Sequence, residues 1–219
     1  PYVHGLFRDV FTGVDTRQKK AIPIGELHML LNKDPQSEKL RRTQAIANLL
    51  FQFCGMPFSD LAHLEKSNLK QGLLKYNRLK TGTPMSIEVL ESAHNAIGGL
   101  YNKTDARSPD YPFRILSGAY KRDEEEAYRE YQSALRRFNN DLKSLSRKLR
   151  ISSSVTSYTL RHSWATTAKY RGVPIEMISE SLGHKSIKTT QIYLKGFELE
   201  ERTKVNKLNY SYVCSFKMF

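Results

Sequence analysis

The feature that most constrains the fold of this chain is an apolar stripe in its second half. Large apolar side chains recur there at alternating spacings of three and four residues, at Leu135, Phe138, Leu142, Leu145 and Leu149. This period places them along one face of an α-helix, and such a face must be buried against other elements. The stripe therefore predicts a long amphipathic helix over residues 123–149.

Shorter segments predict further helices around the long one. Gly55 and Pro57 interrupt the pattern after the second of them, so a separate short helix is expected from Ser59. Residues 102–115 contain two prolines and show no period, which indicates a loop with a short strand as the alternative. The expected helices cover 23–31, 40–53, 88–101, 158–171, 174–182 and a last segment that leads into Tyr193.

One segment alternates in the manner of a β-hairpin. Leu74, Tyr76 and Arg78 alternate with their neighbours, residues 81–83 supply a turn, and an extended pattern resumes over 85–89. This arrangement predicts two antiparallel strands with Lys80 at the tip. The expected fold class is therefore mainly α with a small antiparallel β-sheet.

The charge balance indicates a polyanionic partner. Lys and Arg number 35 against 22 Asp and Glu, which gives a net charge of +13 and a pI near 9.7. Such an excess is typical of nucleic-acid binding, although a basic surface without a special role is the alternative. The face of the long helix from 136 to 150 has only one acid, Asp141. The candidate DNA-binding residues are Arg136, Arg137, Lys143, Arg147, Lys148 and, further on, Lys185.

The remaining composition favours a cytoplasmic chain. No apolar run approaches the roughly 18 residues of a membrane span, and the first ten residues do not resemble a signal peptide. Cys54 and Cys214 lie far apart and lack the spacing of metal ligands, so free thiols are expected. The chain does not begin with Met, which indicates a fragment or a processed product of a longer protein. No membrane partner is expected.

The candidate chemistry lies in three pieces of sequence. These are YTLRHSWAT at 158–166, LGHKSIKTTQIY at 182–193, and Lys80 at the tip of the expected hairpin. Taken alone, each has an ordinary explanation: Arg161 as a surface residue, His184 as a helix cap, and Tyr193 as a core aromatic. Their order and spacing are harder to explain in this way, because His184 follows Arg161 by 23 residues and Tyr193 follows His184 by nine.

This ordered set resembles the C-terminal signature of the tyrosine recombinases, also called phage-type integrases. The family pattern is roughly H-x-x-R-H followed by L-G-H-x-x-x-x-T-T-x-x-Y. With Lys80 and the segment CGMPFSDLAHL, the resemblance covers nearly the whole chain, and it is most like the integrases of conjugative transposons and other bacterial mobile elements. The second half of the pattern matches at Leu182, Gly183, His184, Thr189, Thr190 and Tyr193.

The resemblance implies strand cleavage and rejoining through a 3′-phosphotyrosine. Tyr193 would be the nucleophile, and Arg161 would hold non-bridging phosphate oxygens in the plane of its guanidinium. His184 would add a hydrogen bond that strengthens as charge gathers in the transition state. Lys80 would protonate the leaving 5′ oxygen as general acid. No cofactor or metal is expected, and the acidic run at 123–126 suits a helix N-terminus.

Two positions depart from the family pattern. The first phosphate-binding Arg is missing, because its two possible positions hold Cys54 and Pro57. The His of H-x-x-R is replaced by Tyr158, which can donate a hydrogen bond but cannot act as an imidazolium near pH 7. Since loss of one positioned donor commonly costs about 10²–10³ in rate, a catalytically impaired, DNA-binding relative is an alternative. The candidates to replace the first Arg are Arg41, Arg42 and Arg78.

The resemblance also implies a division of the chain and a set of partners. Residues 1–22 would be a lead-in from a missing core-binding domain, 23–193 the catalytic domain, and 194–219 a tail that is exchanged between protomers or folds back. A tetramer that forms from free monomers would bind double-stranded DNA, with a host DNA-bending protein as a further partner. The location would be the cytoplasm, in association with the nucleoid. The expected activity is integration, excision or inversion of a mobile element. Type IB topoisomerase-like relaxation, a DNA-binding module without chemistry and a basic structural protein are the alternatives.

Overall fold

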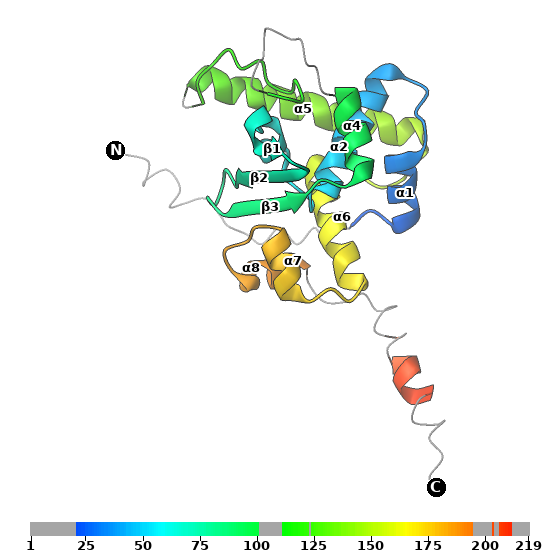
Figure 1. Cartoon of the computed structure of the whole chain (residues 1–219). Helices are drawn as coiled ribbons and strands as arrows, with labels where there is room; N and C mark the ends of the chain where they lie inside the picture. Colours follow the sequence, from blue (N-terminus) through cyan, green and yellow to red (C-terminus); the bar gives the residue numbers. More distant parts are fainter. Residues whose placement is uncertain (1–20, 101–110, 123, 195–202, 204–205, 212–219) are drawn as a thin grey trace, which may run out of the picture.

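The computed structural model describes residues 21–100, 111–122, 124–194, 203 and 206–211 (Figure 1). Within them, helices alternate with one small antiparallel sheet, which confirms the predicted fold class. Most of the predicted loop at 102–115 lies outside the described residues, and 111–115 form no strand. The helices are α1 (Ile24–Asn32), α2 (Glu38–Gln52), α3 (Phe58–Ala62), α4 (Glu91–Leu100), α5 (Glu125–Lys148), α6 (Ser157–Tyr170), α7 (Ile175–Ser181) and α8 (Ile187–Leu194).

The sheet has three strands in the order β1-β2-β3, all antiparallel. β2 (Leu73–Asn77) and β3 (Pro84–Glu88) form the predicted hairpin, with Tyr76 opposite Met85. β1 (Leu69–Lys70) was not predicted, because two residues are too few to show an alternating pattern. It follows a single 3-10 turn, η1 (Lys66–Asn68).

A large apolar core lies between α2, α4 and α5. The stripe of α5 enters it as predicted, with Phe138, Leu142, Leu145 and Leu149 buried and Leu135 half-buried against them. Figure 1 shows α5 along one end of the molecule; α2 packs against it, and α4 packs on α2. The ring of Phe58, at the start of α3, stacks on that of Phe138 with centroids 4.7 Å apart.

The opposite end of the molecule has a much smaller apolar cluster. It consists of Ala165, Ile178, Leu182 and Leu194, contributed by α6, α7, α8 and the turn after α7. Figure 1 shows α6 running from the main body toward α7 and α8, which lie on the far side of the sheet from α5. Among the described residues, no helix combines the length and apolar character that crossing a bilayer requires.

The start of α6 is fixed by side-chain hydrogen bonds. Thr156 caps the helix by accepting from the Thr159 backbone N–H at 3.1 Å, and the Thr159 hydroxyl accepts from the Thr156 N–H at 2.7 Å. Just before it, the Glu26 carboxylate of α1 accepts from the backbone N–H groups of Ser152 and Ser153, at 3.1 Å each. The Ser152 hydroxyl also donates to this carboxylate, at 2.6 Å, and the hydrogen bonds from Ser152 and Ser153, with the Ser152 side chain as the largest cause, lower the pKa of Glu26 to about 2. They tie α1 to the segment just before the helix that carries Arg161.

Candidate active site

Arg161 is buried in the second turn of α6, with 7% of its surface exposed. Its Nη1 donates to the Gly55 carbonyl at 2.9 Å, and its Nη2 donates to the Leu182 carbonyl at 2.7 Å. Gly55 has φ +64°, and a Cβ there would lie 3.2 Å from the Trp164 Cβ and 3.3 Å from the Arg161 Cα. A glycine thus allows the turn between α2 and α3 to lie directly against α6.

His184 lies beside Arg161, as the motif predicts. Its Nε2 is 3.2 Å from the Arg161 Nη2, and its Nδ1 is 2.8 Å from the Thr190 Oγ1. Burial lowers the pKa of His184 to about 4, and the positive charges of Arg161, Arg78 and Lys80 act in the same direction. The imidazole is therefore neutral near pH 7.

Arg78 is a second buried guanidinium at the same place. It follows β2, has 6% of its surface exposed, and donates through Nη1 to the Leu182 carbonyl that also accepts from Arg161. Its Nε lies 2.7 Å from Oδ2 of Asp60, which is itself buried in α3. Burial raises the pKa of Asp60, while the Arg78 guanidinium opposes that rise. Arg78 thus contacts Asp60 through Nε and, through Nη1, the Leu182 carbonyl oxygen that also accepts from Arg161.

Gly183 allows the β2–β3 hairpin to lie close to the turn between α7 and α8. Gly183 has φ +64°, and a Cβ there would lie 2.8 Å from the Met85 Sδ and 3.0 Å from the Arg78 Cγ. The Thr81 hydroxyl at the hairpin tip lies 3.5 Å from the Gly183 carbonyl oxygen. The tip of the β2–β3 hairpin therefore packs on the turn between α7 and α8, where His184 lies.

Lys80 occupies the turn of this hairpin and is exposed, in the position predicted from the sequence. Its charge is one of those that lower the pKa of His184, so the ammonium lies within electrostatic range of the imidazole.

Tyr193 lies in the last turn of α8, while its side chain is outside the described part of the structure. The end of this helix is held by Lys169 of α6, whose Nζ donates to the Leu194 carbonyl at 3.1 Å. A cation at a helix C-terminus is favourable, because the last carbonyls carry partial negative charge. Tyr158 lies one turn before Arg161 on α6 and is 44% exposed.

The three candidates for the missing first Arg lie in different places. Arg41 is exposed and pairs with Asp34 at 3.0 Å. Arg42 donates to the Phe113 carbonyl at 2.8 Å, on the α2 side of the core. Of the three, Arg78 alone shares an acceptor with Arg161. Cys54 and Pro57 occupy the two possible positions of the family Arg. In this chain both lie where the backbone turns, because Cys54 has φ +55° and Pro57 immediately precedes α3.

The predicted DNA-binding residues are all exposed. Lys185 follows His184 in the turn before α8, and the other five lie on α5. The only acid of that face, Asp141, pairs with Lys39 of α2 at 2.7 Å, so its charge is offset. The five on α5 are Arg136, Arg137, Lys143, Arg147 and Lys148.

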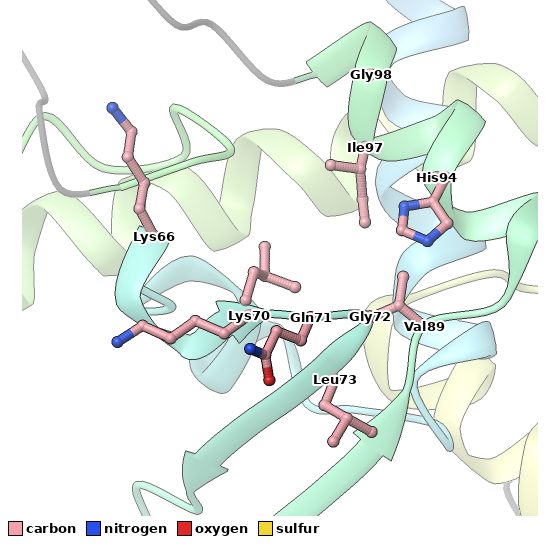
Figure 2. Close-up of a pocket in the computed structure, with 10 residues that line it drawn as sticks. Lys66, Lys70, Gln71, Gly72, Leu73, Val89, His94, Ile97 and Gly98 are labelled. Atoms are coloured by element: carbon pink, nitrogen blue, oxygen red, sulfur yellow. The ribbon is translucent and has the colours of Figure 1, made fainter.

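A separate hollow of about 320 Å³ lies between the β1–β2 turn, the end of β3 and α4 (Figure 2). Its apolar lining includes Leu73, Val89 and Ile97, with Lys66 and Lys70 on the neighbouring turn. None of the predicted site residues lines it. No group of three or more His, Cys, Asp or Glu side chains suited to a metal ion occurs in the part of the chain that the structure describes.

Comparison with known proteins identifies the class to which this fold and site belong. Residues 24–199 match the model of the phage integrase family, and the chain belongs to that family. Two curated relatives are the tyrosine recombinase XerA of Pyrococcus furiosus, 29% identical over 80% of this chain, and the tyrosine recombinase XerD of Halalkalibacterium halodurans, 31% identical over 81% of it. The chain spans 57% of the length of each.

Solved structures show the same fold. A crystal structure of XerA recombinase superposes with a TM-score of 0.60 at 22% identity, covering 85% of this chain and 62% of that one. The Tn1549 transposon integrase in complex with circular intermediate DNA gives a TM-score of 0.55 at 14% identity, covering 87% of this chain and 66% of that one. The match to the family model confirms the family that was predicted from the spacing of Arg161, His184 and Tyr193.

Proposed function

We propose that this chain is the catalytic domain of a site-specific recombinase that cuts and rejoins double-stranded DNA through a 3′-phosphotyrosine on Tyr193. The observation that carries the proposal is the convergence of Arg78, Arg161 and His184 beside the Leu182 carbonyl oxygen. Two guanidiniums that share one acceptor, with an imidazole in contact with one of them, are suited to the non-bridging oxygens of a phosphodiester.

Each step of the reaction uses groups from a different element. The Tyr193 oxygen attacks phosphorus, its proton is lost to water or a neighbouring base, and the bond between phosphorus and the 5′ oxygen breaks. Lys80 gives a proton to the departing 5′ oxygen, while Arg161 and His184 stabilise the charge on the phosphate. Tyr158, at the usual His position, adds a phenolic hydrogen-bond donor. A DNA 5′-hydroxyl then reverses the reaction without ATP, because the phosphotyrosine retains the bond energy.

Arg78 replaces the missing first Arg in this proposal. Its guanidinium lies on the same acceptor as that of Arg161, and Asp60 holds it there from the opposite side. A buried Arg is always charged, so it neutralises phosphate in the same way from a strand as from a helix. An Arg78→Lys variant would keep the charge but lose the planar fork, and a large loss of cleavage in it is expected.

DNA binding is assigned to the exposed basic residues of α5 and to Lys185. Each phosphate that they neutralise contributes roughly −0.9 to the slope of log K against log[salt]. An Arg147→Ala variant should therefore bind more weakly and with a shallower slope, whereas an exposed basic residue outside this face, Lys33, gives the control. An unchanged slope in Arg147→Ala would remove that residue from the interface.

The wider assembly is part of the same proposal. Residues 1–22 lead in from an upstream core-binding domain, 23–193 form the catalytic domain, and 194–219 form a tail that is exchanged between protomers. Four protomers act together on DNA in the cytoplasm, near the nucleoid, with a host bending protein as an additional partner. Integration, excision or inversion of a mobile element is the expected outcome, and a transposon integrase shares the fold.

The test is covalent trapping. A labelled pool of nicked duplexes of randomised sequence is incubated with the chain, so that cleavage next to the nick releases a short 5′-hydroxyl strand and prevents rejoining. We expect a protein–DNA adduct that survives denaturation, is absent in Tyr193→Phe, and is strongly reduced in Arg161→Ala. Sequencing the captured strands gives the target sequence.

The same assay separates the alternatives. Salt-sensitive DNA binding without any adduct indicates a non-cleaving relative, which the replacements at Cys54, Pro57 and Tyr158 favour. An adduct together with relaxation of supercoiled plasmid at unrelated sites indicates a type IB topoisomerase. Either result overturns the proposal of site-specific recombination.

A further inference from the structure

Thr190 is a buried polar residue to which the reaction assigns no role. It lies in the first turn of α8 with none of its surface exposed, whereas the preceding Thr189 is exposed. Its hydroxyl lies 2.8 Å from Nδ1 of His184. Since a buried hydroxyl contributes to stability only when it is paired, this contact is the main reason for a polar side chain at this position.

The contacts with Arg161 and with Thr190 together decide which nitrogen of His184 carries the proton. A guanidinium has donors only, so the Arg161 Nη2 at 3.2 Å needs a lone pair on Nε2. With the imidazole neutral, the hydrogen must then lie on Nδ1 and be donated to the Thr190 oxygen. The free chain therefore holds His184 as the Nδ1–H tautomer.

A bound phosphate requires the opposite arrangement. Phosphate oxygens are acceptors, so His184 can stabilise them only when Nε2 carries a hydrogen. A neutral imidazole with hydrogen on Nε2 has a lone pair on Nδ1, and that nitrogen then needs a donor. The Thr190 hydroxyl can rotate from accepting to donating, which a backbone carbonyl or a carboxylate in its place could not do.

We propose that Thr190 is a positioning residue that lets His184 exchange tautomers, with the hydrogen on Nδ1 in the free chain and on Nε2 when DNA is bound. One proton leaves Nδ1 and one arrives at Nε2, with water as the carrier, so His184 stays neutral throughout. The DNA-bound half rests on the proposed function. The DNA-free half does not.

The charges around His184 favour tautomer exchange over protonation. Arg161 approaches from α6, and Arg78 and Lys80 approach from the hairpin, so an imidazolium would meet three cations. Glu176 and Glu180 of α7, with Lys185, line the same hollow of about 260 Å³ as His184. Burial, as the largest cause, and these three cations together lower the pKa of His184 to about 4.

The first experiment needs no DNA. Nitrogen-15 NMR of the histidine side chains distinguishes the two neutral tautomers, and His184→Gln identifies the signal. At pH 7 we expect the Nδ1–H form in wild type, Thr190→Ser and the exposed control Thr189→Val. In Thr190→Val and Thr190→Ala we expect a shift toward the Nε2–H form. A wild-type tautomer in both folded variants overturns the proposal, as does an Nε2–H form in wild type.

The second experiment uses the covalent trapping assay. Thr190→Val should form the adduct about 10- to 100-fold more slowly, because a partner that orients a reacting group commonly has an effect of that size. Thr190→Ser should restore the rate, and Thr189→Val should leave it unchanged. Equal rates in Thr190→Val and wild type overturn the DNA-bound half. If wild type forms no adduct, the proposed function fails, and the NMR result still decides the proposal for the free chain.

Discussion

The two ends of this molecule are stabilised in different ways. The end that contains α2, α4 and α5 is built on a large apolar core, in which residues such as Leu49, Leu50, Leu142 and Leu145 are completely buried. Among the described residues, the end that contains α7, α8 and the hairpin tip has a cluster of only four buried apolar residues. Instead, it buries Arg78, Asp60 and Arg161.

This difference supports the proposal that the polar end carries the site. Buried guanidiniums are costly unless they are paired, and here they are held by a carboxylate and by backbone carbonyls. The same donors can turn to an incoming phosphate, whereas an apolar core offers nothing to it. The apolar end supplies the rigidity that such an arrangement requires.

The largest effect is expected from breaking the buried ion pair. Asp60→Asn keeps the shape of the side chain but leaves Arg78 without its counter-charge, which should lower the free energy of unfolding by about 3–5 kcal/mol. Urea unfolding followed by circular dichroism measures it. The double variant Asp60→Asn with Arg78→Met should recover part of the loss. If the single variant loses less free energy of unfolding than the double variant, the ion pair does not stabilise the polar end.

Next in size is a cavity at the apolar end. Leu142→Ala should lower the free energy of unfolding by about 2–5 kcal/mol, because Leu142 is completely buried in the large core. Under conditions where the variant is folded, its rate of adduct formation should equal that of wild type. Leu208→Ala, at a residue that is 68% exposed, is the control and should change little. A slower reaction in folded Leu142→Ala would show that the two ends are coupled.

A smaller effect is expected where the hairpin meets the turn before α8. Gly183→Ala adds a Cβ at 2.8 Å from the Met85 Sδ, in a backbone conformation that itself costs roughly 1–2 kcal/mol in a residue with a side chain. Gly72→Ala is matched to it, because Gly72 also has a positive φ, at +74°, and has nothing within 4 Å of the added atom. Only Gly183→Ala should also slow adduct formation, because the contact moves Arg78. Equal losses of stability and rate in both variants would contradict this.

The smallest effect concerns acid stability. The pKa of Glu26 is about 2 in the folded chain, through its bonds to Ser152 and Ser153, against 4.5 without them. A lowered carboxyl pKa stabilises the fold above the unfolded value, and this contribution is lost as pH falls from about 4.5 toward 2. Glu26→Gln should therefore weaken the pH dependence of the unfolding free energy in that range. An unchanged slope would mean that these bonds do not hold α1 to α6 in solution.

Prediction from sequence succeeded where the signal is periodic or local. The stripe of α5 and the alternation around Lys80 are repeated over enough residues to define a helix and a hairpin, and both are confirmed. The two-residue β1 is too short for any pattern. The contacts of Asp60 with Arg78 and of Thr190 with His184 were missed, because each depends on a partner from a different part of the fold or from the opposite side of a turn.

The sequence by itself determined the family, through the order and spacing of Arg161, His184 and Tyr193, and it determined most of the helices. Only the tertiary structure decided which of Arg41, Arg42 and Arg78 lies beside Arg161. The physical reason is that spacing along the chain constrains neighbours within one or two turns. The meeting of a hairpin, a helix and a turn depends on the core that packs them together and on two glycines that allow their backbones to approach.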